Sequence, residues 1–331
     1  MTTEAVSSWQ RFHRHVRELW PRRALVPIVL FAGWPLYCIA IGERRWEFAV
    51  SIFLGAVLPY IGPTSKRVFV GIMPIAMVGL FYDWMRFVKN VGLSPERIHL
   101  CDLRALEIRL FGVDLGDRVG TIHDRIQSTP SLPLDVLFAI PYGTFIGVSA
   151  LFALFLYFVD YQAMRRFSGA FLVLNVLAFV TYRLYPAAPP WYFHAHGCVA
   201  DLATHASEGP NLARVDEWLG FRYFGGFYAR STNVFGAVPS LHVAYPLLAA
   251  IEGFRPFGEL RHARWLKWPL RIASVLFFLW MCAAAVYLDH HWILDLICGC
   301  LYALAVCLAF RKIRFFAPVD GRVDAPLPAT H

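Results

Sequence analysis

Long apolar stretches separated by short polar connections run through most of the chain. A transmembrane helix needs about 20 apolar residues to cross a hydrocarbon core of ~30 Å. Eight stretches come near this length with few charges, and we predict a spanning helix in each: 24–42, 46–62, 67–88, 132–159, 166–185, 240–254, 268–288 and 291–311. The second and sixth are the shortest. The pattern predicts an all-α fold, a polytopic membrane bundle of about eight transmembrane helices.

The composition agrees with a membrane protein. Of the 331 residues, 58% are hydrophobic and 16% aromatic, and the mean hydropathy is +0.49. These values are too apolar for an ordinary soluble domain of this length. The first apolar stretch is longer than the core of a cleavable signal peptide, so we expect it to remain in the protein as a helix.

The formal net charge of +8 is carried mostly by Lys and Arg residues in the connections between apolar stretches. Membrane topology explains this placement better than nucleic-acid binding, and we expect no nucleic-acid partner. With eight spans, the most basic segments all fall on one side. The positive-inside rule then predicts that both termini are cytoplasmic. The loop 186–238 and the turn between the last two spans would face the periplasm or an equivalent lumen.

Seven cysteines stand at positions 38, 101, 198, 282, 298, 300 and 307, mostly within apolar stretches. Their odd number and placement predict neither a disulfide framework nor a zinc site, and we interpret them as small apolar core residues. His194, His196 and Cys198 imitate a metal cluster but have no fourth ligand nearby in the sequence. We therefore expect no metal and no cofactor.

Two short polar runs stand at the predicted outer ends of apolar stretches, 239–242 (PSLH) and 287–295 (YLDHHWILD). His291 and Asp295 are four residues apart, so on a helix the carboxylate can accept a hydrogen bond from the imidazole. The other ring nitrogen is then free to act as a nucleophile or base. The neighbouring His290 points about a quarter-turn away, and we interpret it as structural.

The first run supplies a second histidine, His242, after Pro239 and Ser240. Proline favours the first turn of a helix, where free backbone N–H groups and the Ser240 hydroxyl can bind a phosphate. Histidine titrates near neutral pH, which suits proton transfer to and from an alcohol oxygen. A lone histidine at a membrane edge is more often a packing residue. Ionisable groups gathered on one side of a membrane more often serve a function.

Arg183 lies in a third segment, 182–192 (YRLYPAAPPWY), which ends the fifth predicted span on the same side. Its guanidinium could bind a phosphate through two hydrogen bonds. A proline-rich exit with interfacial aromatic residues would have the same appearance.

Four stretches together resemble a known family: 187–192, 212–216, 235–242 and 287–295. They are similar to the type 2 phosphatidic acid phosphatase superfamily, and within it to the inositol phosphorylceramide synthase branch, over roughly residues 130–311. The resemblance implies a six-helix catalytic core in which His291 attacks phosphorus and forms a phosphohistidine. It further implies that Asp295 orients His291 and that His242 is the acid/base.

The chain also departs from the broader superfamily. Ala285 stands where ordinary members have an arginine six residues before the nucleophilic histidine, and the usual lysine-containing first signature is not recognisable. The missing arginine is a trait shared with the synthase branch and argues against a plain phosphatase. The candidates for phosphate or substrate binding are then Arg183, Arg214, Arg230, Ser240 and Tyr287, and Arg214 lies in a matching stretch.

The resemblance implies an enzyme, a membrane phosphotransferase. It would move a phospho-head group, phosphoinositol in the first instance, from a phospholipid such as phosphatidylinositol to a lipid hydroxyl such as that of ceramide. One alternative is a lipid phosphate or pyrophosphate phosphatase with water as the acceptor. A more distant alternative is a non-enzymatic transporter of lipid or phosphate. The sequence does not indicate whether a protein partner is needed.

This interpretation divides the chain into four parts. Residues 1–90 contain the N-terminal transmembrane helices, and residues 91–131 form a mixed-charge connection with a helix suited to the membrane interface. Residues 132–311 form the catalytic core, and residues 312–331 form a loose cytoplasmic tail. Near the end of the third span, the spacing of Asp83 and Arg86 predicts an ion pair.

Overall fold

The computed structural model describes residues 8–88, 91–204, 209–228, 234–255 and 264–312. Most of the described residues are helical, with a single two-stranded sheet, so the predicted all-α class is confirmed. They form two compact units, one ending at Leu80 and the other running from Phe81 to residue 312.

The first unit contains α1 (Ser8–Leu19), α2 (Val26–Ala40), α3 (Trp46–Ala56), α4 (Leu58–Ile61) and most of α5 (Pro63–Met85). Helices α2 and α3 pack closely at Gly55, where an added Cβ atom would lie 2.5 Å from the Cβ of Phe31. Beside this contact, the Ser51 hydroxyl donates to the Phe31 carbonyl at 2.6 Å. A glycine and a small polar side chain therefore allow two apolar helices to approach.

The second unit continues from the last residues of α5. Its elements are η1 (Pro95–Arg97), α6 (Cys101–Phe111), β1 (Val113–Asp114), β2 (Val119–Gly120), α7 (Ile122–Gln127), α8 (Leu132–Val159), α9 (Tyr161–Leu184), α10 (Pro190–His196), α11 (Pro210–Leu219), α12 (Tyr223–Tyr228), α13 (Leu241–Gly253), η3 (Arg264–Leu266), α14 (Lys267–Tyr287) and α15 (Ile293–Lys312). Strands β1 and β2 pair antiparallel. The predicted Asp83–Arg86 ion pair is confirmed at 3.2 Å.

Each of the eight predicted spans overlaps helical residues in the described part of the chain, and the second, 46–62, contains two helices, α3 and α4. Among the described residues, five helices are long and apolar enough to cross a membrane: α5, α8, α9, α14 and α15 up to Phe310. Two shorter apolar segments, Val26–Ala40 and Trp46–Ile61, match the first two predicted spans.

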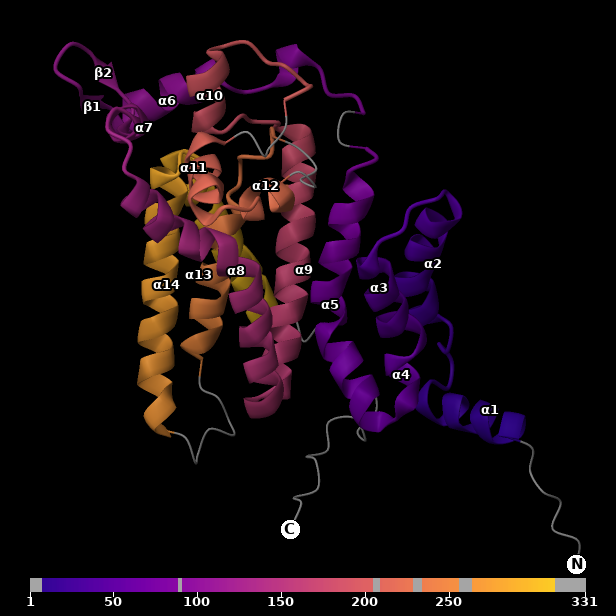
Figure 1. The fold of residues 1–331 in the computed structure, drawn as a ribbon. Coiled ribbons are helices and arrows are strands. Elements are labelled where there is room, and N and C mark those ends of the chain that lie inside the picture. Colours follow the sequence, from indigo (N-terminus) through magenta and orange to yellow (C-terminus); the bar gives the residue numbers. More distant parts are fainter. Residues whose placement is uncertain (1–7, 89–90, 205–208, 229–233, 256–263, 313–331) are drawn as a thin grey trace, which may run out of the picture. The chain divides into compact units, whose positions relative to one another are not determined.

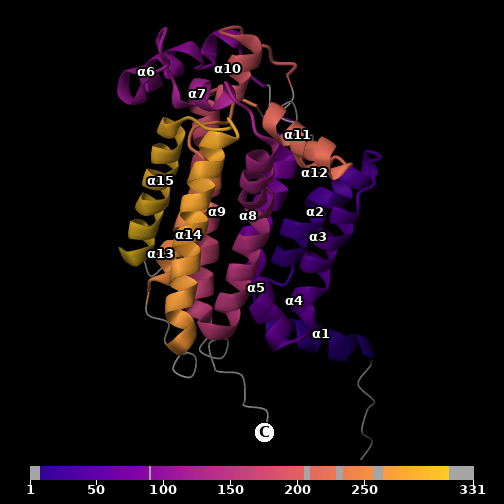
Figure 2. The same ribbon diagram turned by 60° about the vertical axis from the view of Figure 1, so that its left-hand side comes forward.

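The short sixth span has a structural explanation. Helix α13 has only 13 residues and packs against α8, α9, α14 and α15 (Figure 2). Most of its side chains are buried, so it is covered by the surrounding helices rather than by lipid. Buried Glu252 near its end pairs with Arg166 of α9 at 2.8 Å and with Arg255 at 3.0 Å. These ion pairs compensate the charge of the buried carboxylate.

Short helices cover one end of the long helices in the second unit (Figure 1). We call this layer the cap and define it as residues 95–127, 190–204 and 209–228. A disulfide between Cys101 and Cys198 joins the first two of these ranges across 97 residues of sequence. Our prediction that no cysteines form disulfides was therefore wrong. These two cysteines lie in the polar connections and meet only through tertiary packing, whereas the other five form no disulfide among the described residues.

Candidate active site

Main-chain contacts hold the two histidine motifs together. The backbone N–H of Ser240 donates to the carbonyl of Asp295 at 3.0 Å, which bonds the start of α13 to the first turn of α15. A Cβ atom on Gly299 would lie 2.3 Å from the Ser240 carbonyl oxygen. Only glycine allows α13 and α15 to approach so closely at this point.

The alanine-proline segment supports this region from another side. The N–H of Ala187 donates to the carbonyl of Phe235 at 2.9 Å, and the N–H of Ala237 donates to the carbonyl of Ala187 at 3.1 Å. Ala187 and Ala188 are fully buried. The segment therefore fixes the main chain around Ala237, which contacts His291.

His242 and His291 face each other at hydrogen-bond distance. Nδ1 of His242 lies 2.9 Å from Nε2 of His291. Nδ1 of His291 lies 3.1 Å from the Ala237 carbonyl oxygen and 3.4 Å from Oδ2 of Asp295. Both oxygens are acceptors, so we assign the proton of a neutral His291 to Nδ1. Its Nε2 then keeps a lone pair directed at His242, as a nucleophile requires.

Asp295 lies in the first turn of α15 and is fully buried. Its Oδ2 accepts a hydrogen bond from the Trp292 N–H at 2.9 Å, and its Oδ1 has no hydrogen-bond partner among the described residues. The Ala237 carbonyl lies closer to the His291 ring than the carboxylate does. The main chain therefore shares the orienting contact that the sequence interpretation gave to Asp295 alone.

Two tyrosines surround His242. Tyr142 of α8 stacks on the imidazole with ring centroids 4.1 Å apart, and its hydroxyl lies 3.2 Å from Nδ1. Tyr228 of α12 places its hydroxyl 3.3 Å from Nε2. Burial raises the pKa of Tyr228, so this hydroxyl stays protonated at neutral pH and can donate to Nε2. Sequence reasoning missed both tyrosines because neither lies in a recognised motif.

A charged network lies behind residues 288–292, the loop that carries His291. The buried carboxylate of Asp289 lies 2.6 Å from Nδ1 of His194 and 3.1 Å from Nδ1 of His123. Burial alone would raise the pKa of Asp289, but the two histidines lower it below its usual value. The cap thus holds the loop through two histidines that the sequence interpretation left without a role.

His194 also contacts a second carboxylate. Its Nε2 lies 3.0 Å from Asp124, which pairs with Arg104 of α6 at 2.6 Å. Burial alone would lower the pKa of His194, but Asp289 and Asp124 raise it above its usual value. The residues that imitate a metal cluster in the sequence therefore have other partners. His194 contacts the two carboxylates, Cys198 is in the disulfide and His196 packs against Tyr192. Among the described residues, no group of three His, Cys, Asp or Glu side chains is placed to bind a metal ion.

Glu107 of α6 binds the start of α15. Its buried carboxylate accepts hydrogen bonds from the N–H groups of Ile293 at 2.9 Å and Leu294 at 3.3 Å. A carboxylate at this position satisfies free N–H groups and interacts favourably with the helix dipole. On the same helix, Leu103 packs with Ala237 and Trp292. The helix predicted for the membrane interface thus packs against the loop of His291.

Two of the predicted substrate-binding residues have partners elsewhere. Arg214 of α11 makes two hydrogen bonds to the fully buried Asp135 of α8, at 2.8 Å and 3.2 Å. The hydroxyl of Tyr287 donates to the Ser131 carbonyl at 3.2 Å. These contacts join α11 and α14 to the start of α8. Substrate binding by Arg214 and Tyr287 stays a prediction.

The remaining predicted residues differ in their placement. Ser240 is fully buried beside the two histidine motifs, and its hydroxyl has no hydrogen-bond partner among the described residues. The Arg183 guanidinium lies next to Gly92, where an added Cβ atom would be 3.2 Å from Nη2. Arg230 lies outside the described residues. The structure therefore brings His242, His291 and Asp295 together with the Ser240 backbone, and the roles of these residues stay predictions.

Comparison with known protein families finds a match to one family. Residues 115–309 match the PAP2 superfamily, which is more than half of the chain. The chain is 33% identical to the phosphoinositol dihydroceramide synthase of Bacteroides thetaiotaomicron, over 89% of this chain and 95% of that protein.

Two fungal proteins are also similar. The inositol phosphorylceramide synthase of Candida albicans is 28% identical over 92% of this chain and 60% of its own length. The catalytic subunit of that synthase in Saccharomyces cerevisiae is 30% identical over 82% of this chain and 63% of its own length. The chain thus spans less than two thirds of the length of either fungal relative. No solved structure gives a significant match. The helical bundle, the paired histidine motifs and these similarities agree that the chain belongs to the PAP2 superfamily, the type 2 phosphatidic acid phosphatases and their relatives.

Proposed function

We propose that this protein is a membrane phosphotransferase that moves phosphoinositol from phosphatidylinositol to the hydroxyl of a ceramide-type lipid. The observation that carries the proposal is the 2.9 Å contact between His242 and His291, with the far nitrogen of His291 held by Ala237 and Asp295. The names of the bacterial and fungal relatives support the substrates. The acceptor in those proteins is a lipid, which favours a transferase over a phosphatase.

The first chemical step is capture of the head group. Nε2 of His291 attacks phosphorus, a P–N bond forms, and the P–O bond to diacylglycerol breaks. His242, which enters this step as the imidazolium, gives one proton to the departing oxygen, so diacylglycerol leaves as an alcohol and His242 becomes neutral. The 2.9 Å between the rings leaves no room for phosphorus. We therefore expect the side chain of His242 to shift when the substrate enters.

The second step transfers the head group to the acceptor. His242, now neutral, takes the proton of the acceptor hydroxyl, whose oxygen attacks phosphorus as the P–N bond breaks. His291 returns to its starting form, and each displacement is in line. The Tyr228 hydroxyl, 3.3 Å from Nε2 of His242, can support the proton changes on that ring. Burial of His291, which is 5% exposed, limits access of water, the acceptor that a phosphatase would use.

The proposal includes the side of the membrane, and two independent features support it. By the positive-inside rule, the distribution of basic connections favours the non-cytoplasmic side for the histidine motifs. The Cys101–Cys198 disulfide lies in the cap that covers the same end of the helices. Disulfides persist in oxidising compartments and are rare in the cytosol. Both features support a site that faces the periplasm or a lumen, with the termini in the cytoplasm.

The test uses purified protein in lipid nanodiscs containing phosphatidylinositol labelled in the inositol ring and phosphate. With ceramide present, we expect labelled inositol phosphorylceramide. Without an acceptor, quenching with denaturant at alkaline pH should trap labelled protein, because the P–N bond of phosphohistidine is stable to base and labile to acid. His291→Ala should abolish the label, and His242→Ala should slow its formation strongly. Full turnover by both variants would refute the catalytic assignment. Release of free inositol phosphate as the main product in the presence of ceramide would refute the acceptor.

A further inference from the structure

His290, the first of the two adjacent histidines, lies in a setting unlike that of a packing residue. It is only 7% exposed, and its Nε2 has no hydrogen-bond partner among the described residues. The ring lies beside Tyr142 and Tyr228, with centroid separations of 5.0 Å and 5.7 Å. A buried polar atom without a partner is costly unless a ligand or water satisfies it. The structural role expected from the sequence leaves this nitrogen unexplained.

Nε2 of His290 points into a small hollow between α11 and α12. An added Cβ atom on Gly209 would lie 3.0 Å from this nitrogen. The hollow is lined by Gly209, Leu212, Ala213, Phe224, Gly225, Tyr228 and His290, and its volume of about 10 Å³ suits one water molecule or one hydroxyl group. Tyr228 forms part of its wall and also reaches His242. A group in the small hollow is therefore separated from the histidine pair by one side chain.

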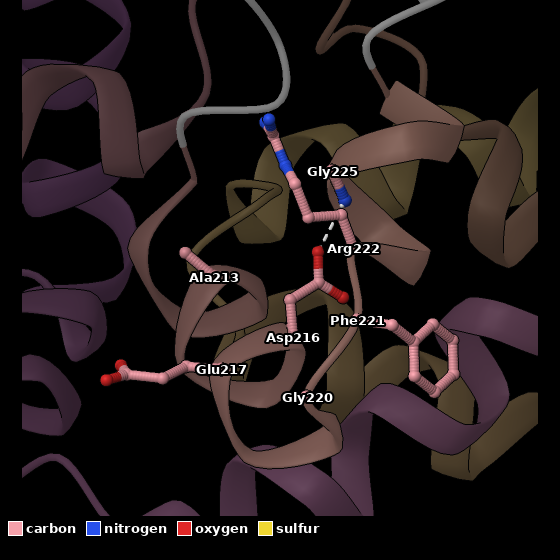
Figure 3. Close-up of a pocket in the computed structure, with 7 residues that line it drawn as sticks. All are labelled: Ala213, Asp216, Glu217, Gly220, Phe221, Arg222 and Gly225. Carbon is pink, nitrogen blue, oxygen red and sulfur yellow. Dashed lines mark hydrogen bonds between the residues drawn. The ribbon is translucent and has the colours of Figure 1, made fainter.

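A larger hollow adjoins the small one. It has a volume of about 340 Å³, within the range of roughly 300–1,000 Å³ usual for ligand pockets. Its lining residues are Ala213, Asp216, Glu217, Gly220, Phe221, Arg222 and Gly225 (Figure 3). Ala213 and Gly225 line both hollows, so the wall between them is made of the smallest residues.

The polar groups of the larger hollow suit a neutral ligand with several hydroxyl groups. The Asp216 carboxylate is occupied by the N–H groups of Phe224 and Gly225, at 2.9 Å and 2.7 Å. Glu217 and Arg222 extend from the wall in different directions (Figure 3). Their charges are opposite, which favours neither a cationic nor an anionic ligand, and both carry groups that hydrogen-bond to hydroxyls.

The protonation state of His290 limits which ligand groups can form a hydrogen bond with its Nε2. Burial and the neighbouring His291 lower the pKa of His290 to about 3, so the ring is neutral at physiological pH. Its Nε2 is then either a single donor or a single acceptor. A hydroxyl can satisfy both forms, whereas a phosphate oxygen can satisfy only the donor form.

We propose that the two hollows form the head-group subsite, in which the larger one receives the polyol ring and Nε2 of His290 hydrogen-bonds a ring hydroxyl. This inference rests on the proposed function and extends it to the residues that recognise the head group. In the two-step reaction the inositol stays on phosphorus while diacylglycerol and ceramide exchange. The subsite must therefore be separate from the lipid path, as a hollow in the cap is.

The test compares variants in transfer from phosphatidylinositol and from phosphatidylglycerol to ceramide. His290→Phe keeps a ring but loses the polar nitrogen, and we expect the KM for phosphatidylinositol to rise about tenfold with a smaller change in kcat. His290→Gln can place an amide nitrogen near the lost Nε2 and should restore most of the affinity. The preference for phosphatidylinositol over phosphatidylglycerol should become smaller in His290→Phe and stay close to that of the wild type in His290→Gln.

A second variant probes the larger hollow without touching the buried histidine. Ala213 is exposed on α11, so Ala213→Leu should fold while filling the hollow and raising the KM for phosphatidylinositol. Ala203→Leu, at an exposed site outside both hollows, is the control and should behave as the wild type. Unchanged KM and head-group preference in both His290→Phe and Ala213→Leu would overturn the subsite. Failure of the wild type to form labelled protein would instead overturn the proposed function.

Discussion

Asp289 offers the sharpest test of how the cap supports the reaction. Asp289→Asn keeps the size of the side chain and removes its charge. The backbone at residue 289 is left-handed, with φ of 66°, a conformation that Asn tolerates better than Ala. The substitution therefore isolates the contacts of the carboxylate with His194 and His123.

The size of the effect follows from these contacts. The carboxylate is 1% exposed and accepts from His194 at 2.6 Å, with His123 at 3.1 Å. Asparagine keeps one acceptor oxygen but turns an NH₂ group toward the other histidine, so one charge-assisted hydrogen bond is lost. Such a bond contributes about 1.5–3 kcal/mol when buried. If this loss of free energy appears in the ordering of the loop that carries His291, kcat should fall by about tenfold to 150-fold.

The assay measures phosphohistidine formation and complete transfer to ceramide, together with thermal unfolding in detergent. Asp102→Asn is the matched control. Asp102 also pairs with a histidine, His99, but Asp102 is exposed and His99 only half-buried, and such solvent-accessible pairs contribute about 0–1 kcal/mol. Asparagine also replaces aspartate well at the start of a helix. If Asp289→Asn keeps kcat within about twofold of the wild type, the loop is held by other contacts and the reasoning is wrong.

Three further predictions concern the same region. His194→Gln should lower the melting temperature most below about pH 6.5 and less at higher pH, because the raised pKa of His194 stabilises the fold only while the ring is protonated; a pH-independent difference would contradict this. Replacing Cys101 and Cys198 by Ser should destabilise the second unit by about 4–5 kcal/mol, since the disulfide closes a loop of 97 residues; an unchanged melting temperature without reductant would refute the link. Tyr228→Phe removes the hydroxyl beside Nε2 of His242 and should reduce kcat about fivefold in rapid-quench measurements, whereas a wild-type rate would exclude a role in proton transfer.

Hydropathy alone located the helices because the requirement to span a bilayer acts on each segment separately. Even the short segment 240–254 was found, although the reason that it is short, its burial among neighbouring helices, appears only in three dimensions. The spacing of His291 and Asp295 likewise pointed to a local contact. The structure places them 3.4 Å apart and adds a closer carbonyl that no side-chain pattern reports.

The features that sequence reasoning missed all depend on distant residues. Cys101 and Cys198 meet across 97 residues. Glu107 lies on a helix whose mixed charges fit a membrane interface equally well, and its partners are backbone N–H groups, which have no signature in the sequence. Arg214 was assigned to phosphate by analogy, but its pairing with Asp135 depends on how α11 meets α8.

The contact of α13 with α15 has a consequence for how such enzymes can diversify. The separation of the His242 and His291 rings is set where Gly299 meets the Ser240 carbonyl, by main-chain atoms of adjoining helices. The walls of the proposed head-group subsite belong to other elements, mainly α11 and α12. New substrates can therefore be accommodated by changing those walls while the reactive centre keeps its spacing. In an engineered enzyme, residue 299 is the position to leave untouched.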